Sequence, residues 1–154
     1  MKARVLIPAL VLCFVAAAVC FADDPQIGTW KLNEAKSKIG AGSPKVTTVV
    51  YEAAGDSVKI TVDGTDPDGK PAHSEWTGKY DGKDYAVTGD PSVDTRSYEK
   101  VNDHTLAFIS KKGDKVTISG RGVVSADGKS RTVTLNGTDS KGKKFTSTAV
   151  YDKQ

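Results

Sequence analysis

The clearest pattern in this sequence is the alternation of apolar and polar residues over short runs. One apolar face carries Val58, Ile60 and Val62, a second carries Val116 and Ile118, and a third carries Val133 and Leu135. A period of two residues is that of a β-strand with one buried face. After residue 23 no segment keeps a helical period. The best helical candidate is the stretch 33–38, which predicts one turn ended by the Gly40–Pro44 breaker cluster.

Turn-forming residues punctuate these runs at regular intervals. The clusters are Ala54–Asp56, Pro67–Lys70, Tyr80–Lys83, Gly89–Pro91, Asn102–Asp103, Lys112–Asp114, Ala126–Lys129 and Ser140–Lys143. Pairs such as Asp-Gly tolerate the positive φ that tight hairpin turns require. A spacing of roughly 8–15 residues between clusters predicts about nine or ten strands joined by short hairpins.

The two ends of this series are themselves β-type runs, Ile27–Asn33 and Phe145–Tyr151. If they pair with each other, the sheet closes on itself and leaves no edge strand open. The pattern therefore predicts an all-β fold, a single antiparallel up-and-down β-barrel from about Ile27 to Asp152, with at most a turn or two of helix.

Two hairpins share one sequence type. The stretch 60–70 aligns without a gap on the stretch 133–143, and both end in a Gly-Lys pair. We interpret this as a structural repeat, which arises either from an ancestral duplication or from convergence on one hairpin solution. The alternative is that turns rich in Asp, Gly and Lys resemble one another in any case.

Residues 1–22 have the features of a secretion signal. Lys2 and Arg4 precede an apolar run, Val5–Val19, and Cys20–Ala22 supplies small residues before a polar segment. The run falls short of the roughly 20 residues that span a bilayer. A lipoprotein signal centred on Cys20 fits less well, because Val19 is bulky. We expect cleavage after Ala22, a single domain over 23–154, and a periplasmic or extracellular location.

Processing changes the composition in two ways that bear on function. Both cysteines, Cys13 and Cys20, lie in the removed part, so the mature chain has no disulfide and no thiol nucleophile. Removing Lys2 and Arg4 leaves 20 basic residues against 19 acidic ones. A balance this close to neutral does not favour nucleic acid or an anionic membrane as a partner. We expect a monomer without stable membrane insertion.

Both ends of the mature chain resemble the calycins, the superfamily of lipocalins and fatty-acid-binding proteins. Gly28–Leu32 resembles their Gly-x-Trp opening strand, in which the Trp plugs the closed end of the barrel. Val150–Lys153 resembles the closing strand of the intracellular lipid-binding branch, and small secreted bacterial lipocalin-like proteins are the nearest kind. The resemblance implies a barrel that binds a small, mostly apolar ligand.

The chain also departs from that superfamily. The segment Glu34–Pro44 is too short and too rich in Gly and Pro for the helix-turn-helix lid of the lipid-binding branch. The position of that branch's carboxylate-binding Arg, two residues before the Tyr of the last strand, is Ala149 here. Fatty-acid carriage by the familiar mechanism is therefore not expected.

Catalytic and metal-binding patterns are missing from the sequence. His73 and His104 are the only histidines, and neither has an acidic or histidine partner at ligand spacing. No nucleophile elbow, phosphate-binding Gly-rich loop or zinc signature occurs. We expect a protein that is not an enzyme, with no catalytic residue, no metal and no cofactor.

The expected ligand site is a set of aromatic residues with one cation. Arg96 and Tyr98 share a strand face, a pairing suited to an anionic or polar group, and a rim-exposed strand is the alternative. The predicted ligand-binding residues are Trp76, Tyr80, Arg96, Tyr98 and Phe108. The same aromatics also suit a plugged core, which leaves a ligand-free structural or protein-interaction barrel as the alternative function.

Two further arginines carry structural expectations. Arg121 or Arg131 is expected to pack on Trp30, as an arginine does at the closed end of lipocalins. Arg121-Gly122 is also interpreted as a β-bulge, because it interrupts the alternation that begins at Val116.

Overall fold

The computed structural model describes residues 24–139 and 141–154; the expectations about the leader peptide lie outside this part of the chain. Its strands are β1 (Gly28–Leu32), β2 (Lys45–Ala54), β3 (Ser57–Thr65), β4 (Pro71–Gly78), β5 (Tyr85–Thr88), β6 (Thr95–Asn102), β7 (Thr105–Lys112), β8 (Lys115–Val124), β9 (Ser130–Thr138) and β10 (Lys144–Lys153). One short 3₁₀ helix, η2 (Glu34–Lys36), lies between β1 and β2. The described part of the chain is thus almost entirely β-sheet, as predicted.

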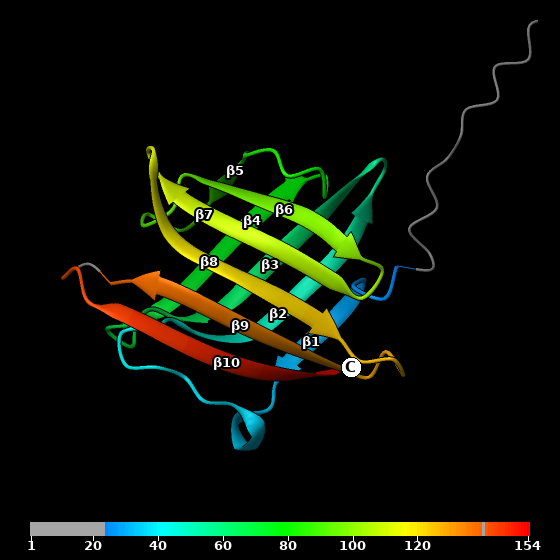
Figure 1. The fold of residues 1–154 in the computed structure, drawn as a ribbon, viewed down its shortest axis with the longest axis horizontal. Coiled ribbons are helices and arrows are strands. Elements are labelled where there is room, and N and C mark those ends of the chain that lie inside the picture. Colours follow the sequence, from blue (N-terminus) through cyan, green and yellow to red (C-terminus); the bar gives the residue numbers. More distant parts are fainter. Residues whose placement is uncertain (1–23, 140) are drawn as a thin grey trace, which may run out of the picture.

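The ten strands form one closed barrel with up-and-down connectivity. Each strand pairs antiparallel with the next in sequence, and β1 pairs antiparallel with β10 (Figure 1). The predicted all-β, single antiparallel barrel is confirmed, including its closure by the two terminal runs. Among the described residues, no helix has the length and apolar character needed to cross a bilayer.

The seam between β1 and β10 is short, and flanking hydrogen bonds extend it. Only three residue pairs form the ladder, beginning with Trp30 opposite Lys153. Beyond them, the backbone N–H of Asn33 donates to Val150 O at 2.8 Å, and that of Gln154 donates to Thr29 O at 3.0 Å. These bonds satisfy backbone groups at both ends of the seam that would otherwise be left unpaired.

The strand register sorts side chains into an inner and an outer set, because paired residues lie on the same face of a sheet. The inner face holds a buried core whose members are Trp30, Val49, Tyr51, Val58, Ile60, Trp76, Val87, Val93, Tyr98, Leu106, Val124, Val133, Ala149 and Tyr151. Most of these lie toward the end of the barrel where β1 begins and β10 finishes. We call this the closed half, and the other end, with η2, the open half.

The link from β1 to β2 contains the one helical turn that the sequence predicts. Asn33 caps η2 by accepting a hydrogen bond from Lys36 N at its Oδ1, at 3.2 Å. The chain then runs along β10, where Gly40 N donates to Ser147 Oγ at 2.9 Å. Any side chain at position 40 would press on the backbone carbonyl of Thr146, so glycine allows this close approach.

The two similar hairpins fold alike. Asp66 Oδ1 accepts from the backbone N–H groups of Asp68 and Lys70. Asp139 Oδ1 accepts in the same way from Lys141 and Lys143. The hairpins are β3–β4 and β9–β10, six strands apart, whereas two equal halves of a ten-stranded barrel would place them five apart. This offset favours convergence on one hairpin type over duplication of half a barrel.

The β-bulges lie at positions that the alternation of apolar and polar residues did not predict. The register shifts at Thr47 in β2, at Val101 in β6 and at Thr117 in β8. The predicted bulge at Arg121-Gly122 is wrong, because both residues pair regularly with β7. The break in alternation after Val116 is real, but the extra residue that causes it is Thr117.

Trp30 plugs the closed half and gives the first test. It is fully buried, and its Nε1 donates to Gln26 O at 2.9 Å. Trp30→Ala should lower the free energy of unfolding by about 3–5 kcal/mol, because a large cavity is left. Trp30→Phe should cost about 1–3 kcal/mol, since the Gln26 carbonyl loses its donor.

Urea denaturation followed by far-UV circular dichroism measures both changes. Lys31→Ala, on the exposed side of the same strand, is the control and should change the free energy by less than about 0.5 kcal/mol. A loss below about 1 kcal/mol for Trp30→Ala would contradict the importance of this plug.

Candidate functional site

Four of the predicted site residues form one continuous aromatic cluster inside the barrel. Tyr98 is its centre, with its ring centroid 4.7 Å from that of Trp76, 5.7 Å from that of Phe108 and 6.2 Å from that of Tyr80. Tyr85 extends the cluster, at 5.7 Å from Trp76. The Trp76, Tyr80 and Tyr85 contacts have steep interplanar angles, the edge-to-face arrangement that aromatic rings favour.

The members of this cluster differ in how freely they can contact a ligand. Trp76 and Tyr98 are almost fully buried, while Phe108 and Tyr80 remain partly exposed. Tyr80 lies just beyond the end of β4, because the strand stops at Gly78. Phe108 is therefore the aromatic best placed to meet a bound molecule.

Arg96, the predicted anchor, faces the barrel interior and is half-buried. It lies opposite Ser110 in the β6–β7 register, and its Nε donates to Ser110 Oγ at 2.7 Å. Its Cζ is 6.0 Å from the ring centroid of Phe108. Trp76 Nε1 donates to Arg96 O at 2.8 Å, which fixes this part of β6 against the aromatic cluster. All five predicted residues are thus brought together.

Arg96 forms no ion pair with any carboxylate in the described part of the chain. Its Nε is used by Ser110, so the two terminal nitrogens are the donors that remain for a further partner. A half-buried guanidinium with two free terminal nitrogens can bind a carboxylate or another planar anion by donating paired hydrogen bonds.

The apolar lining changes between the two halves of the barrel. Fully buried side chains concentrate in the closed half, whereas several inward side chains of the open half stay partly exposed while packing on the core. The partly exposed apolar residues of the open half are Leu32, Ile39, Val46, Val62, Phe108 and Leu135, while Ser110, Phe145 and Ser147 there are buried. The interior is therefore packed more completely at the closed end than at the open end.

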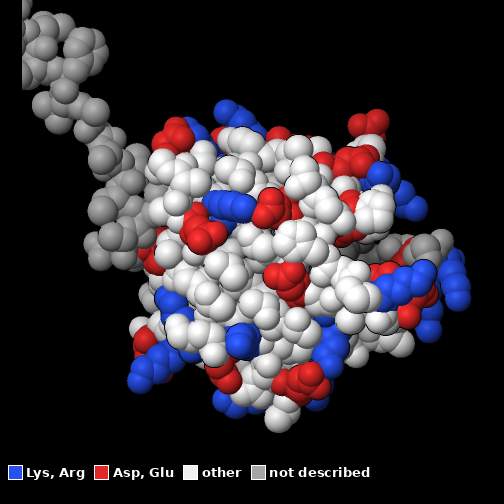
Figure 2. Space-filling model, turned by 180° about the vertical axis from the view of Figure 1, so that it is seen from behind, with Lys and Arg blue, Asp and Glu red and all other residues white. Residues whose placement is uncertain are grey.

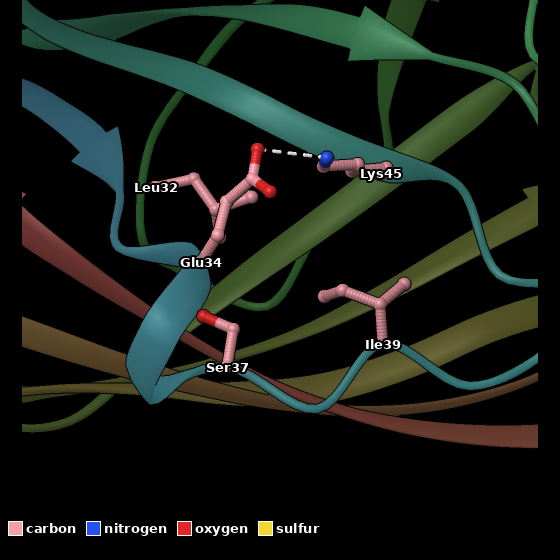
Figure 3. Close-up of a pocket in the computed structure, with 5 residues that line it drawn as sticks. All are labelled: Leu32, Glu34, Ser37, Ile39 and Lys45. Carbon is pink, nitrogen blue, oxygen red and sulfur yellow. Dashed lines mark ion pairs between the residues drawn. The ribbon is translucent and has the colours of Figure 1, made fainter.

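A small hollow of about 170 Å³ opens at the rim of the open half. Leu32, Glu34, Ser37, Ile39 and Lys45 line it. Figure 3 shows the ion pair that crosses it, in which Lys45 Nζ lies 2.8 Å from Glu34 Oε1. The predicted aromatic residues do not line this hollow. It lies where η2 meets β2, at the entrance to the open half.

Sequence reasoning left the most deeply buried cation of the described residues, Arg131, out of the candidate ligand site. It is only 3% exposed, and its Cζ lies 4.6 Å from the ring centroid of Tyr51. Gly122 makes room for it, since a Cβ there would lie 2.6 Å from one of its terminal nitrogens. The signal was present in the sequence, because Arg131 shares the period-two face of Val133 and Leu135.

The expected packing of an arginine on Trp30 is wrong. The cation over the Trp30 ring is Lys153, whose Nζ lies 5.0 Å from the ring centroid. Lys153 is opposite Trp30 in the β1–β10 register, so the seam itself places it there. Arg131 stacks on Tyr51 instead, and Arg121 is exposed on the outer face.

Burial favours the neutral form of three interior tyrosines, Tyr51, Tyr80 and Tyr151. Burial raises the pKa of Tyr151 to about 12, although the charge of Arg131 opposes the change. Burial also raises the pKa values of Tyr51 and Tyr80 well above the usual value. These phenols therefore surround the guanidinium of Arg131 as dipoles and not as counter-charges.

The histidines lie away from this cluster. His73 is exposed on the outer face of β4, and its Nδ1 lies 2.6 Å from Asp63 Oδ1. The expectation that neither histidine has an acidic partner is therefore wrong for His73, because pairing of β3 with β4 brings Asp63 opposite it. In the described residues, no group of three or more His, Cys, Asp or Glu could hold a metal ion.

No protein-family model matches the sequence, and no curated protein is significantly similar to it. The architecture agrees with a lipocalin-like barrel: it is closed, antiparallel and up-and-down, with Gly28-Thr-Trp30 in its first strand. The proposed function therefore rests on the geometry of the barrel interior.

The buried phenols give a test by pH. Phenols of the unfolded chain ionise near pH 10, whereas those of Tyr51, Tyr80 and Tyr151 ionise only at higher pH in the folded protein. Between about pH 10 and 12 the folded state therefore binds more protons than the unfolded state, and the free energy of unfolding should fall as pH rises.

Urea unfolding at several pH values, with absorbance at 295 nm to count phenolates, measures this fall. Tyr151→Phe should make the decline shallower by up to about 1.4 kcal/mol per pH unit, the contribution of one proton. A variant with an unchanged slope would contradict the burial of this phenol.

Proposed function

We propose that this protein binds a small, mostly apolar anionic ligand in the open half of its barrel, with Arg96 as the anchor. The carrying observation is the distribution of charge between the two faces of the strands. All the acidic residues that lie within strands are on the outer face: Glu52, Asp63, Glu75, Glu99 and Asp152. Two guanidiniums, those of Arg96 and Arg131, face inward.

This distribution gives the interior a positive potential that no strand carboxylate inside the barrel offsets. In a site partly shielded from water, such charges act more strongly than on the surface. An anionic group entering the open half meets Arg96 first, because Arg96 is half-buried whereas Arg131 is 3% exposed. Ser110 fixes the guanidinium by its hydrogen bond, so little of its rotamer freedom remains to be lost on binding.

The rest of the ligand is expected to be apolar. Phe108, Leu135 and Val62 are inward-facing and partly exposed, so a hydrocarbon group that covered them would remove apolar surface from water. Trp76 and Tyr98 form the floor beneath Phe108 and are already buried. The ligand would therefore lie above the aromatic cluster, between it and the rim at Lys45.

We further propose that the protein is a non-catalytic, secreted or periplasmic member of the lipocalin-like group. The resemblance of both terminal strands and the closed barrel support the group, and the leader-like residues 1–22 support the location. The ionisable side chains of the described interior are mainly tyrosines and arginines. Both are protonated at neutral pH and are therefore poor proton acceptors.

A second candidate function is a ligand-free structural or interaction barrel. The specific observation in its favour is the packing of the closed half, where Trp30 and Ile60 have no exposed surface and Trp76 and Tyr98 very little. A protein whose core fills the whole barrel needs no ligand for stability. Binding experiments separate the two functions.

The decisive measurement is a titration of Trp fluorescence with dodecanoate and with dodecanol, which share a chain length and differ in charge. Native mass spectrometry of the protein purified from its own compartment tests for a ligand already bound. We expect dodecanoate to bind more tightly. Arg96→Met should weaken dodecanoate by about 1.5–3 kcal/mol, the range for a hydrogen bond to a charged group, and leave dodecanol nearly unchanged.

Lys31→Met is the matched control, since it also removes one positive charge and Lys31 is exposed on the outer face of β1. It should alter neither affinity. An empty protein whose fluorescence responds to no apolar ligand would contradict the carrier function and favour the structural barrel. Equal loss of dodecanoate affinity in both variants would show that the effect comes from net charge alone.

A further inference from the structure

The centre of the outer face of β6–β9 carries little charge. This centre is the row Glu99, Ala107, Arg121 and Thr134, one residue from each of four neighbouring strands. The next row along contains Ser97, Ile109, Ser119 and Asn136. These strands lie toward the viewer in Figure 1. Glu99 and Arg121 are the only charged residues of the two rows.

Three large apolar side chains next to this row are strongly exposed to solvent. Ile109 is 40% exposed, Val123 is 42% and Val101 is 45%. They are three of the four large hydrophobic side chains that are strongly exposed in the described part of the chain. Clustering of such residues on one face is the mark of an interaction surface, whereas single exposed residues need no explanation.

The face is also hollowed at its centre. A depression of about 430 Å³ lies over Gly120, with Ala107, Ile109, Ser119, Arg121 and Asn136 among its lining residues. It is open to solvent, and most of its lining residues face outward; Phe108 also lines it, whereas Arg96 does not. Small side chains in β7 and β8 create it, which allows another surface to approach the sheet closely.

The two charges of the central row form no ion pair within the part of the chain that the structure describes. Neither Glu99 nor Arg121 forms an ion pair with any described residue. They flank Ala107 on opposite sides, two strand spacings or roughly 10 Å apart. Asp81 pairs with Glu99 at the backbone on that side, and its carboxylate lies 3.7 Å from Lys83 Nζ. In the central row, one side of β7 therefore carries an acidic residue and the other side a basic one.

This arrangement is self-complementary about β7. A twofold axis that runs along β7, in the plane between two stacked molecules, exchanges the two sides of the strand. It therefore places Arg121 of each molecule opposite Glu99 of the other, and it brings Ala107 and Ile109 against their own copies. An interface of this isologous kind is the commonest way in which identical chains associate.

We propose that the outer face of β6–β9 is a homodimer interface, in which a second copy of this chain stacks on β7 with two symmetric Arg121–Glu99 ion pairs around an Ile109 and Ala107 centre. This departs from the monomer expected from the sequence. The face is only four strands wide, so the contact belongs to the small class of specific interfaces, near roughly 1,200 Å² in total. The dimer is accordingly weak, with a dissociation constant in the micromolar range.

The remaining surface does not offer the same match. On the face seen from behind in Figure 2, acidic and basic side chains are interspersed. Several of these charges form ion pairs within the chain, as in Lys59–Glu75 and Lys79–Asp56. A charged partner gains little from residues that are already paired.

Charge-reversal variants test the proposal. Their association is measured by sedimentation velocity of the mature chain over about 1–300 µM, a range that spans the expected dissociation constant. The wild type should shift from monomer to dimer over this range, and added salt should weaken the shift. Arg121→Glu and Glu99→Arg should each weaken association by at least about tenfold, because each creates two like-charge contacts. The double variant Glu99→Arg/Arg121→Glu should restore it.

Glu52→Arg is the matched control, because it makes the same change on β2, on the opposite side of the barrel. It should leave association unchanged. A wild type that stays monomeric throughout, or a dimer that neither single reversal weakens, would overturn the proposal. A folded double variant that does not regain dimerisation would also overturn the proposal. Misfolding of the single variants could not explain that result.

A cysteine on the proposed axis gives a second, geometric readout. With Cys13 and Cys20 changed to Ser, Ala107→Cys introduces the chain's sole thiol. Two such thiols face each other across the axis, so mild oxidation should yield a disulfide-linked dimer in high yield. Glu52→Cys should yield little. Equal cross-linking of the two variants would show random collision and contradict the interface.

Discussion

The pairing of β1 with β10 is the constraint on which the rest of this structure depends. A meander of ten strands has two open edges unless its ends meet, and here they meet over only three residue pairs. The side chains at the seam add further bonds: Asn33 Nδ2 donates to Asp152 Oδ2 at 2.7 Å, and Val150 N donates to Ser37 Oγ at 2.9 Å. Closure also gives the barrel an inside, and so makes both the core and the proposed ligand site possible.

Much of this fold could be predicted, because short-range patterns determine it. Alternation fixes which residues form strands, and Asp-Gly turns fix where the strands reverse; Gly69 and Gly142 both adopt the positive φ that such turns require. The register irregularities could not be predicted. A bulge such as that at Thr117 changes the facing of every residue beyond it, and its position depends on pairing with a neighbouring strand that the local sequence does not reveal.

The candidate site was predictable to a similar degree. Arg96 and the aromatic residues could be found because few residues of these types exist in the chain and the strand face of Arg96 includes Tyr98. Arg131 was missed, although it alternates with Val133, because a buried guanidinium without a carboxylate is normally disfavoured. The Arg131 guanidinium stacks on the ring of Tyr51 at 4.6 Å. Gly122 has no side chain, which leaves space for the guanidinium. Both partners come from distant strands.

The alternation that buries the apolar residues also sorts the charges, and this links fold to function. Because successive residues face opposite sides, one choice of register sends Glu99 outward and Arg96 inward together. A slip of one residue would exchange them and would place carboxylates among the phenols of the core. The positive interior is thus a property of the register as a whole. Hydrophobic burial selects that register, and the charge distribution that an anionic ligand would recognise follows from it.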